Sequence, residues 1–308
     1  MKILVIGHVA YDFTCNIKEF PAEDSKTHFV YDNACVGGFG GNASSLLGKY
    51  GVETYLASAT GDDTYANLVR DELKNNLVHI DSVETIFGAR TSLALILNTG
   101  HKRTVLSVDK EPLFKKKNDI PIEPDILLVD GYDYNMTLST LDRFSSKISI
   151  FDADEVNDAT LEICKRANYI ICSKAFAEKV TGTKADIKNS KSLVNIYTSL
   201  LSKFPERVIV VTLDAGGALY MVENQIRVMP GLKVDVKDTT GAGDFFRAGF
   251  TYALSQRYDI EKCVTFANVI GGLSTRILGG TSSMPDLSEV NSYLVSKYEV
   301  KQNVVGNK

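Results

Sequence analysis

The sequence of 308 residues lacks the features that mark several classes of protein. It has five cysteines and no Cys-x-x-Cys pair. An odd count without paired spacing argues against a disulfide framework or a zinc site, and free thiols in a reducing cytoplasm are expected. The formal net charge is -4, so the chain also lacks the basic surplus of a nucleic-acid-binding protein.

Long apolar runs and a dinucleotide motif are missing as well. No stretch approaches the roughly 20 apolar residues of a membrane-spanning helix. The opening MKILVIGHVAYDF lacks the basic and long apolar regions of a secretory signal peptide, so we expect a cytoplasmic protein without a membrane partner. No Gly-x-Gly-x-x-Gly follows the first apolar run, which argues against a dehydrogenase.

Short apolar runs of strand length are present throughout the chain. They occupy residues 3–6, 55–58, 126–130, 148–154, 169–173 and 208–213. Amphipathic stretches separate them, as in residues 63–76, where the apolar side chains share one helical face. This alternation predicts a three-layer α/β/α fold around a mainly parallel central sheet.

Two regions interrupt this alternation, residues 13–33 and residues 90–108. The second region indicates a hairpin with its turn at 98–100. Together the two regions predict a small separate sheet, which would have to bury one face. The alternative is an edge hairpin of the main sheet. In either case one domain over residues 1–308 is expected.

The most informative segment is DTTGAGDFFRAGF at residues 238–250. It follows a strand-like LKVDV and opens a helical run. The glycines permit backbone angles that other residues avoid, and a glycine-rich turn at a helix start presents N–H groups to an anion. A carboxylate at Asp244 could then cap the helix or act as general base toward a hydroxyl that attacks a phosphoryl group.

Residues 238–250 resemble the second signature of the ribokinase-like, or pfkB, family of carbohydrate kinases. GGFGGNA at residues 37–43 is similar to the first signature, and the resemblance extends over nearly the whole chain. It implies a ribokinase-like fold with a small β-sheet lid, and transfer of the γ-phosphate of ATP to a hydroxyl, a primary alcohol, of a small sugar. It implies Asp244 as the base and an anion hole of main-chain N–H groups from Gly241, Ala242 and Gly243.

The resemblance also assigns the other site residues by position. Those expected to hold the sugar are Asp12, Gly37, Gly38 and Asn42. Those expected at ATP are Thr212, Asp214, Gly217 and Asn268, with Asp214 in place of the usual glycine. A monovalent cation, often potassium in the family, would be held by Asp238, Thr240, Thr275, Gly279 and Ser283.

One motif departs from the family. Its Asn-x-x-Glu, which helps to organise Mg²⁺ through water, is replaced by Ser-Lys-Ala-Phe at residues 173–176, and Glu178 follows. ATP and Mg²⁺ are still the implied cofactors. The departure supports a rival hypothesis, a catalytically silent sugar-binding protein, whereas the intact Gly-Ala-Gly-Asp turn argues against it.

The substrate stays open at this stage. Members that act on nucleosides share the same motifs, and such an acceptor would need a wider, more apolar floor beside Asp12. In the family the lid covers the sugar and often pairs two subunits, so a homodimer through the lid is an expected state. The lid bases Lys26, Arg90 and Arg103 either hold an anionic group of the substrate or are solvated surface charge.

Overall fold

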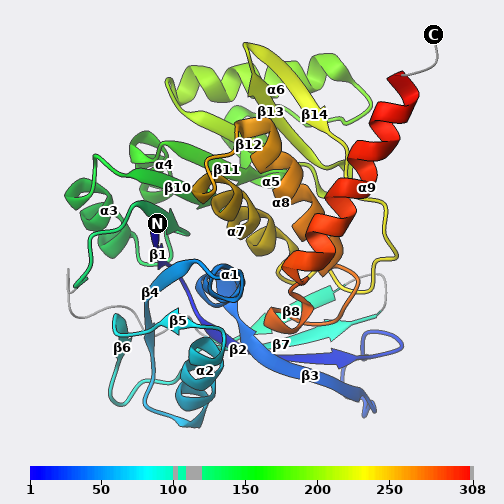
Figure 1. The fold of residues 1–308 in the computed structure, drawn as a ribbon. Helices are drawn as coiled ribbons and strands as arrows, with labels where there is room; N and C mark the ends of the chain where they lie inside the picture. The colour runs from blue at the N-terminus through cyan, green and yellow to red at the C-terminus, as the bar shows by residue number, and fades with distance from the viewer. Residues whose placement is uncertain (100–102, 109–119, 306–308) are drawn as a thin grey trace.

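The structure is a computed structural model that describes residues 1–99, 103–108 and 120–305. Within these residues ten strands form one central sheet (Figure 1), in the order β14-β13-β12-β11-β10-β9-β1-β4-β5, with β6 also paired to β4. Seven central strands are parallel: β1 (Lys2–Ile6), β4 (Glu53–Thr60), β5 (Val78–His79), β9 (Ile126–Val129), β10 (Ile148–Ala153), β11 (Tyr169–Ser173) and β12 (Val208–Thr212). The short β6 (Val83–Thr85) is also parallel, and β13 (Ala218–Val222) and β14 (Gln225–Met229) add an antiparallel edge.

Helices cover both faces of this sheet, as the alternating pattern predicted. On one face lie α1 (Gly38–Lys49), α2 (Thr64–Asn75), α7 (Ala242–Ser255), α8 (Ile260–Ser274) and α9 (Leu287–Val305). On the other lie α3 (Tyr134–Arg143), α4 (Asp158–Arg166), α5 (Lys174–Thr181) and α6 (Ser190–Lys203). Two short 3₁₀ turns, η1 (Asp214–Gly216) and η2 (Thr281–Ser283), lie in loops.

Two hydrophobic cores result from the period of two along the strands. Within β1, Ile3 and Val5 belong to the core under α1 and α7, whereas Leu4 and Ile6 belong to the core under α3 to α6. All four side chains are buried, which is why these strands appear in the sequence as continuous apolar runs. None of the described helices is both long and apolar enough to cross a membrane.

A second sheet stands apart from the first, in the order β3-β2-β7-β8. Its strands are β2 (Ala10–Asn16), β3 (Val30–Gly37), β7 (Leu93–Asn98) and β8 (Arg103–Ser107). The prediction of a small separate sheet is therefore confirmed, and the alternative of an edge hairpin is wrong. Gly100, in the expected hairpin turn, lies outside the described residues.

One expected strand is absent. Residues 232–236, the LKVDV segment, have no regular secondary structure, because the sheet ends at β14 before them. Their alternating apolar side chains face the pocket described below instead of a neighbouring strand, and Leu232 packs against Gly272 of α8. The apolar residues of this segment do alternate, but they do so because they line the pocket and not because they belong to a β-strand.

Candidate active site

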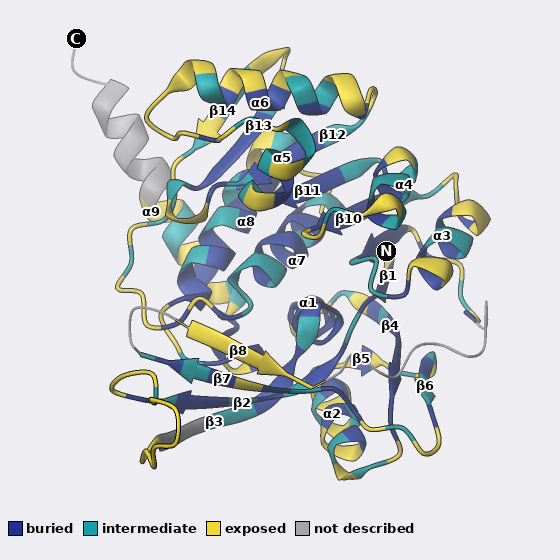
Figure 2. Cartoon of the chain, turned by 180° about the vertical axis from the view of Figure 1, so that it is seen from behind, coloured by how far each residue is buried: buried dark blue, intermediate teal, exposed yellow. Residues whose placement is uncertain are grey.

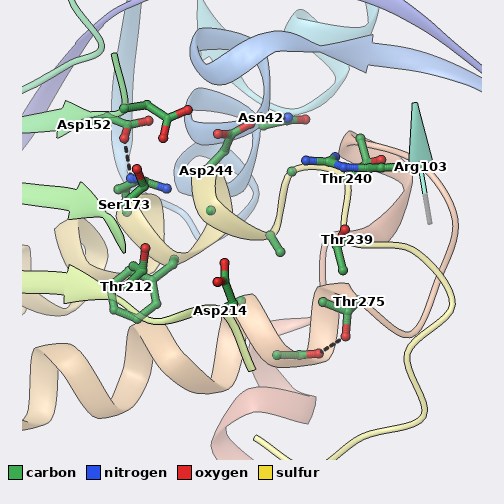
Figure 3. A pocket seen from close by; sticks show the side chains of 18 of the residues that line it. Asn42, Arg103, Asp152, Ser173, Thr212, Asp214, Thr239, Thr240, Asp244 and Thr275 are labelled. Carbon is green, nitrogen blue, oxygen red and sulfur yellow. Dashed lines mark hydrogen bonds and ion pairs between the residues drawn. The ribbon is translucent and has the colours of Figure 1, made fainter. Parts of the chain in front are cut away.

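A pocket of about 640 Å³ lies between the small sheet and the carboxyl ends of the central parallel strands. Ligands of open α/β sheets commonly bind at this edge. The pocket is lined by most of the residues expected from sequence, namely Asp12, Gly38, Asn42, Thr212, Asp214, Gly217, Thr240, Gly241, Ala242, Gly243, Asp244, Asn268 and Thr275. In Figure 3 Asn42 and Asp244 lie together, and Thr212 and Asp214 lie farther away. The first side, with Asp12, is called the acceptor end below, and the second side, with the other residues expected at ATP, the nucleotide end. Four expected residues do not line it: Gly37, Asp238, Gly279 and Ser283.

Asp244 lies in the first turn of α7, three positions after the N-cap. The cap is Gly241, whose φ of 74° lies in the left-handed region that glycine adopts without strain. Of the two roles open to Asp244, helix N-capping is thus excluded by its position. Its Oδ2 instead accepts a hydrogen bond of 2.8 Å from Nδ2 of Asn42, at the acceptor end of the pocket.

The surroundings of Asp244 make its carboxylate more basic than usual. The side chain is reached from the pocket but is enclosed by protein, and this desolvation raises its pKa. The Asn42 hydrogen bond and the charges of Arg247 and Arg103 act in the opposite direction without cancelling the effect. A raised pKa suits a general base, because proton transfer from a hydroxyl becomes less uphill.

The main-chain N–H groups expected to form the anion hole lie at the same helix start. Ala242 N donates to Thr239 O over 3.3 Å, a long internal bond, and Phe245 N begins the helical ladder by donating to Gly241 O. The helix dipole adds positive potential at this end. A phosphoryl group placed here would lie next to Asp244.

Two glycines shape the acceptor end around Asp12. A Cβ added to Gly37 would lie 1.9 Å from Oδ2 of Asp12, and one added to Gly38 would lie 2.7 Å from the main-chain oxygen of His8. Gly38 also has a φ of 73°. Gly37 thus leaves the space that the Asp12 carboxylate occupies, and Gly38 leaves room for His8, which explains why larger residues do not fit at either position.

Burial raises the pKa of Asp12 from 3.8 to about 7, and the negative charge of Asp244 adds to the shift. The ionised form accepts hydrogen bonds from sugar hydroxyls better than the protonated form. We therefore expect acceptor affinity to rise as pH increases through about 7. Isothermal titration of an acceptor across this pH range measures the effect, and Asp12→Asn should abolish the pH dependence together with most of the affinity.

The raised pKa of Asp12 also affects the stability of the unliganded protein, which should fall as pH rises, whereas acceptor affinity should rise. The folded protein keeps a proton on Asp12 that the unfolded chain releases, so this residue's contribution is present at low pH and is lost as pH rises through about 7. Relative to wild type, the unliganded Asp12→Asn protein should gain stability between about pH 4 and pH 8 in urea unfolding. A constant difference across this range would contradict a raised pKa.

Three of the four residues expected at ATP, Thr212, Asp214 and Gly217, lie at the end of β12 and in the loop after it. Asp214 has a φ of 51°, in the left-handed region, where aspartate is tolerated better than most side chains. This conformation explains how aspartate replaces the usual glycine without disrupting the loop. Gly217 could not be replaced by a larger residue in the same way, because a Cβ there would lie 1.9 Å from Met229 O. Asn268 Nδ2 donates to Pro230 O and fixes the segment that lines this end.

The residues expected to hold a monovalent cation lie close together, with Thr240 and Thr275 at the pocket and Asp238, Gly279 and Ser283 outside its lining. The Asp238 carboxylate accepts bonds from Thr240 N, Thr240 Oγ1 and Gly279 N at 2.9, 2.7 and 3.0 Å. Asp238 N donates to Thr275 O at 3.1 Å. Ser283 Oγ donates to Gly280 O in the adjoining turn. In the described part of the chain, no cluster of three His, Cys, Asp or Glu residues could hold a metal.

Glu178 does not replace the missing glutamate of Asn-x-x-Glu. It accepts hydrogen bonds from Ala185 N and Lys184 Nζ, at 2.9 and 2.8 Å, and so fixes the loop between α5 and α6. Ser173 caps α5 through its Oγ, which accepts from Phe176 N. Asp154 lines the pocket from the end of β10, the strand that pairs with β11. One or two carboxylates, with waters and phosphate oxygens, suit Mg²⁺, so the donor set fits this ion.

Sequence reasoning missed a buried ion pair under the anion site. Arg247 Nε lies 2.5 Å from Oδ1 of Asp152, with only 6% and 9% of the side chains exposed. A Cβ on Gly243 would lie 2.3 Å from an Arg247 nitrogen, so the arginine fills the space behind the turn. The sequence held a signal for the acidic partner: Asp152 and Asp154 lie at the carboxyl end of the apolar run at residues 148–154, and the carboxyl ends of parallel strands meet at one edge.

The three basic residues of the lid region have different surroundings in the structure. Arg103 lines the pocket from β8, whereas Lys26 and Arg90 are exposed and do not line it. Surface charge therefore describes Lys26 and Arg90, whereas Arg103 is exposed as well but borders the pocket. Its side chain points into the site in Figure 3.

Comparisons with known proteins agree with this geometry. The model of the pfkB family of carbohydrate kinases matches residues 1–287. An ATP-dependent ribose-1-phosphate kinase of Halopiger xanaduensis is 24% identical over 306 residues, covering 97% of this chain and 100% of the relative. A nucleoside kinase of Methanothermobacter thermautotrophicus is 23% identical over 295 residues, covering 93% of each chain.

Solved structures show the same fold. The crystal structure of ribokinase from Cryptococcus neoformans in complex with ADP superimposes with a TM-score of 0.82, at 22% identity, and covers 95% of this chain and 99% of that chain. The ribokinase-like fold predicted from the sequence is confirmed, as is the kinase class. The chain belongs to the pfkB family of carbohydrate kinases.

Proposed function

We propose that this kinase moves the γ-phosphoryl group of ATP to a hydroxyl, a primary alcohol, of a small sugar or sugar-like acceptor, with Asp244 as general base. The observation that carries the proposal is the position of the Asp244 carboxylate. It lies between the acceptor and nucleotide ends of one pocket, is hydrogen-bonded to Asn42, and shares a helix start with the candidate anion hole.

In the proposed reaction, Asp12, Gly38 and Asn42 hold the acceptor hydroxyls. The reacting hydroxyl gives its proton to Asp244 as its oxygen bonds to the γ-phosphorus, and the bond to the β-phosphate oxygen breaks to release ADP. The N–H groups of residues 241–243 stabilise charge on the transferred group. Thr212, Asp214, Gly217 and Asn268 bind the nucleotide. Mg²⁺, when bound, offsets phosphate charge, and a monovalent cation at Asp238 supports the turn.

Asp154 is the residue that we expect to help to position Mg²⁺, in place of the family's glutamate. Asp154→Asn should raise the Mg²⁺ concentration needed for half-maximal activity by about 10-fold, because such ligand partners typically contribute that much to metal affinity. Titration with Mn²⁺ followed by electron paramagnetic resonance, in the presence of ADP, measures metal binding without turnover. Glu178→Gln is the matched control and should leave both values unchanged, since Glu178 binds the loop after α5.

The outer face of the small sheet fits the expected homodimer. Leu95 and Leu106 are paired across β7 and β8, with 38% and 49% of their surface exposed. Figure 2 shows β8 as an exposed strand. An exposed apolar strand at a sheet edge invites pairing with another chain. Light scattering should give twice the chain mass for wild type, and Leu106→Lys should yield monomers. A monomeric wild-type protein would contradict this arrangement.

A nucleoside is the second candidate acceptor. The floor beside Asp12 carries the apolar side chains of Ala10, Ala94, Ile96 and Val105, which is the feature that such an acceptor would need. Nucleoside kinase is also the name of one relative. The silent-binder hypothesis receives no comparable support, because the base and the helix start are both intact.

ADP formation from ATP and Mg²⁺, with and without potassium, tests the proposal. The acceptors should include ribose, hexoses, sugar phosphates, sugar acids and nucleosides. We expect acceptor-dependent ADP formation with one class and stimulation by potassium. ATP binding without turnover on any acceptor would favour the silent-binder hypothesis.

A further inference from the structure

Arg103 is a pocket cation without an ion-pair partner among the described residues. Two arginines line the pocket, and the other, Arg247, is held by Asp152. Arg103 is exposed on β8, and no carboxylate within residues 1–99, 103–108 and 120–305 forms a salt bridge with it. Its charge nevertheless influences both Asp12 and Asp244, whose pKa values it lowers against the effect of burial.

The position of Arg103 follows from the register of the small sheet. Asp12 pairs with Ala94, and Ala94 pairs with Ser107 at the far end of β8. Ile96 and Val105 form the next pair, and Asn98 and Arg103 the last. Since four residues of strand span roughly 13 Å, the pocket face runs from a carboxylate, across apolar side chains, to a guanidinium.

This end of the sheet is held in place. Asn98, the partner of Arg103, donates through Nδ2 to Lys237 O at 3.1 Å, next to the buried Asp238. Arg103 therefore extends from an anchored strand pair and not from a free loop end. A side chain carried by an ordered strand has less main-chain entropy to lose on binding a ligand than one carried by a free loop.

The negative charge around the pocket gives Arg103 a role in selecting between anionic and neutral acceptors. Five carboxylates line the pocket, those of Asp12, Asp152, Asp154, Asp214 and Asp244, and among the described residues Asp152 alone of them has an ion-pair partner, Arg247. Such a lining repels an anionic acceptor unless a cation is placed where the anion binds. A neutral sugar would need no such group, whereas the planar fork of arginine matches phosphate and carboxylate oxygens in pairs.

We propose that the acceptor is an anionic sugar, and that Arg103 binds its phosphate or carboxylate at the end away from the hydroxyl that reacts. The inference rests on the proposed function, since it names the acceptor of the same site. It makes Arg103 a specificity residue with no role in proton transfer.

Acceptor binding without nucleotide tests this inference separately from turnover. Isothermal titration of wild type, Arg103→Gln, Arg103→Lys and the exposed control Arg90→Gln would use ribose, ribose 1-phosphate, ribose 5-phosphate and gluconate. We expect wild type to bind at least one anionic sugar about 10-fold or more tighter than ribose, and Arg103→Gln to weaken that binding by about 10- to 100-fold. Arg103→Lys should recover part of the loss, and Arg90→Gln should match wild type.

The contrary results are distinct. Equal losses for ribose and the anionic sugars in Arg103→Gln, or no preference of wild type for any anionic sugar, would overturn the inference. Unchanged binding with a lower kcat would assign Arg103 to the transferred phosphoryl group and also overturn it. If any of these results came with phosphorylation of ribose, the inference about Arg103 would be wrong and the proposed function would still be supported. Absence of ADP formation, with Arg103-dependent anion binding intact, would instead reject the proposed function alone.

Discussion

Replacing Asp244 by asparagine is expected to lower kcat by about 10²- to 10⁴-fold, the usual contribution of a positioned general base. Asparagine has nearly the same shape, and its side-chain oxygen can still accept the hydrogen bond from Asn42. The acceptor dissociation constant should therefore change by less than about threefold. Single-turnover kinetics and isothermal titration separate the two quantities.

Asp71→Asn is the matched control for this prediction. Asp71 is exposed on α2 and does not line the pocket, so the same change of charge there should leave kcat near the wild-type value. Near-normal turnover by Asp244→Asn would remove Asp244 from the role of base. A large loss of acceptor affinity with unchanged kcat would instead make it a binding residue.

Arg247→Met is expected to have the largest effect on stability. It leaves the carboxylate of Asp152 buried without its partner, and removing one member of a buried ion pair typically costs about 3–5 kcal/mol. Burial already raises the pKa of Asp152 well above 3.8, and the charge of Arg247 opposes that rise. Without the arginine the carboxyl group should protonate at a higher pH still.

The pH dependence of this loss follows from the same carboxylate. The destabilisation should be larger at high pH than at low pH, where Asp152 can fold in its neutral form. Asp152→Asn combined with Arg247→Met removes both charges and should recover much of the loss. Urea unfolding of the three proteins measures this, and a double variant no more stable than Arg247→Met would contradict the argument.

The layers of the fold were predictable because strands buried on both faces read as apolar runs. Residues 169–173 and 208–213 became β11 and β12 nearly as expected. The run at residues 238–250 placed the start of α7 and Asp244 correctly, since a glycine turn followed by a helical pattern is a local feature. Which elements pack against each other depends on contacts between residues far apart in the sequence, and such contacts were harder to predict.

The errors have specific physical causes. Apolar and polar side chains alternate in residues 232–236 because one side of this segment faces the pocket. The same alternation is typical of a β-strand, so the sequence pattern could not distinguish the two. The Asp152–Arg247 pair joins residues 95 positions apart, so only the three-dimensional arrangement reveals it. Arg103 lies on β8, and the register of β8 against β7 places it on the pocket face, whereas Arg90 and Lys26 lie in segments without regular secondary structure.

Phosphorus NMR of the reaction mixture tests the central claim most directly. With ATP, Mg²⁺ and the best acceptor of the panel, the account predicts one new phosphate monoester for each ADP formed, and neither product with Asp244→Asn on the same time scale. Release of inorganic phosphate without a phosphorylated acceptor, or monoester formed equally well by Asp244→Asn, would contradict it.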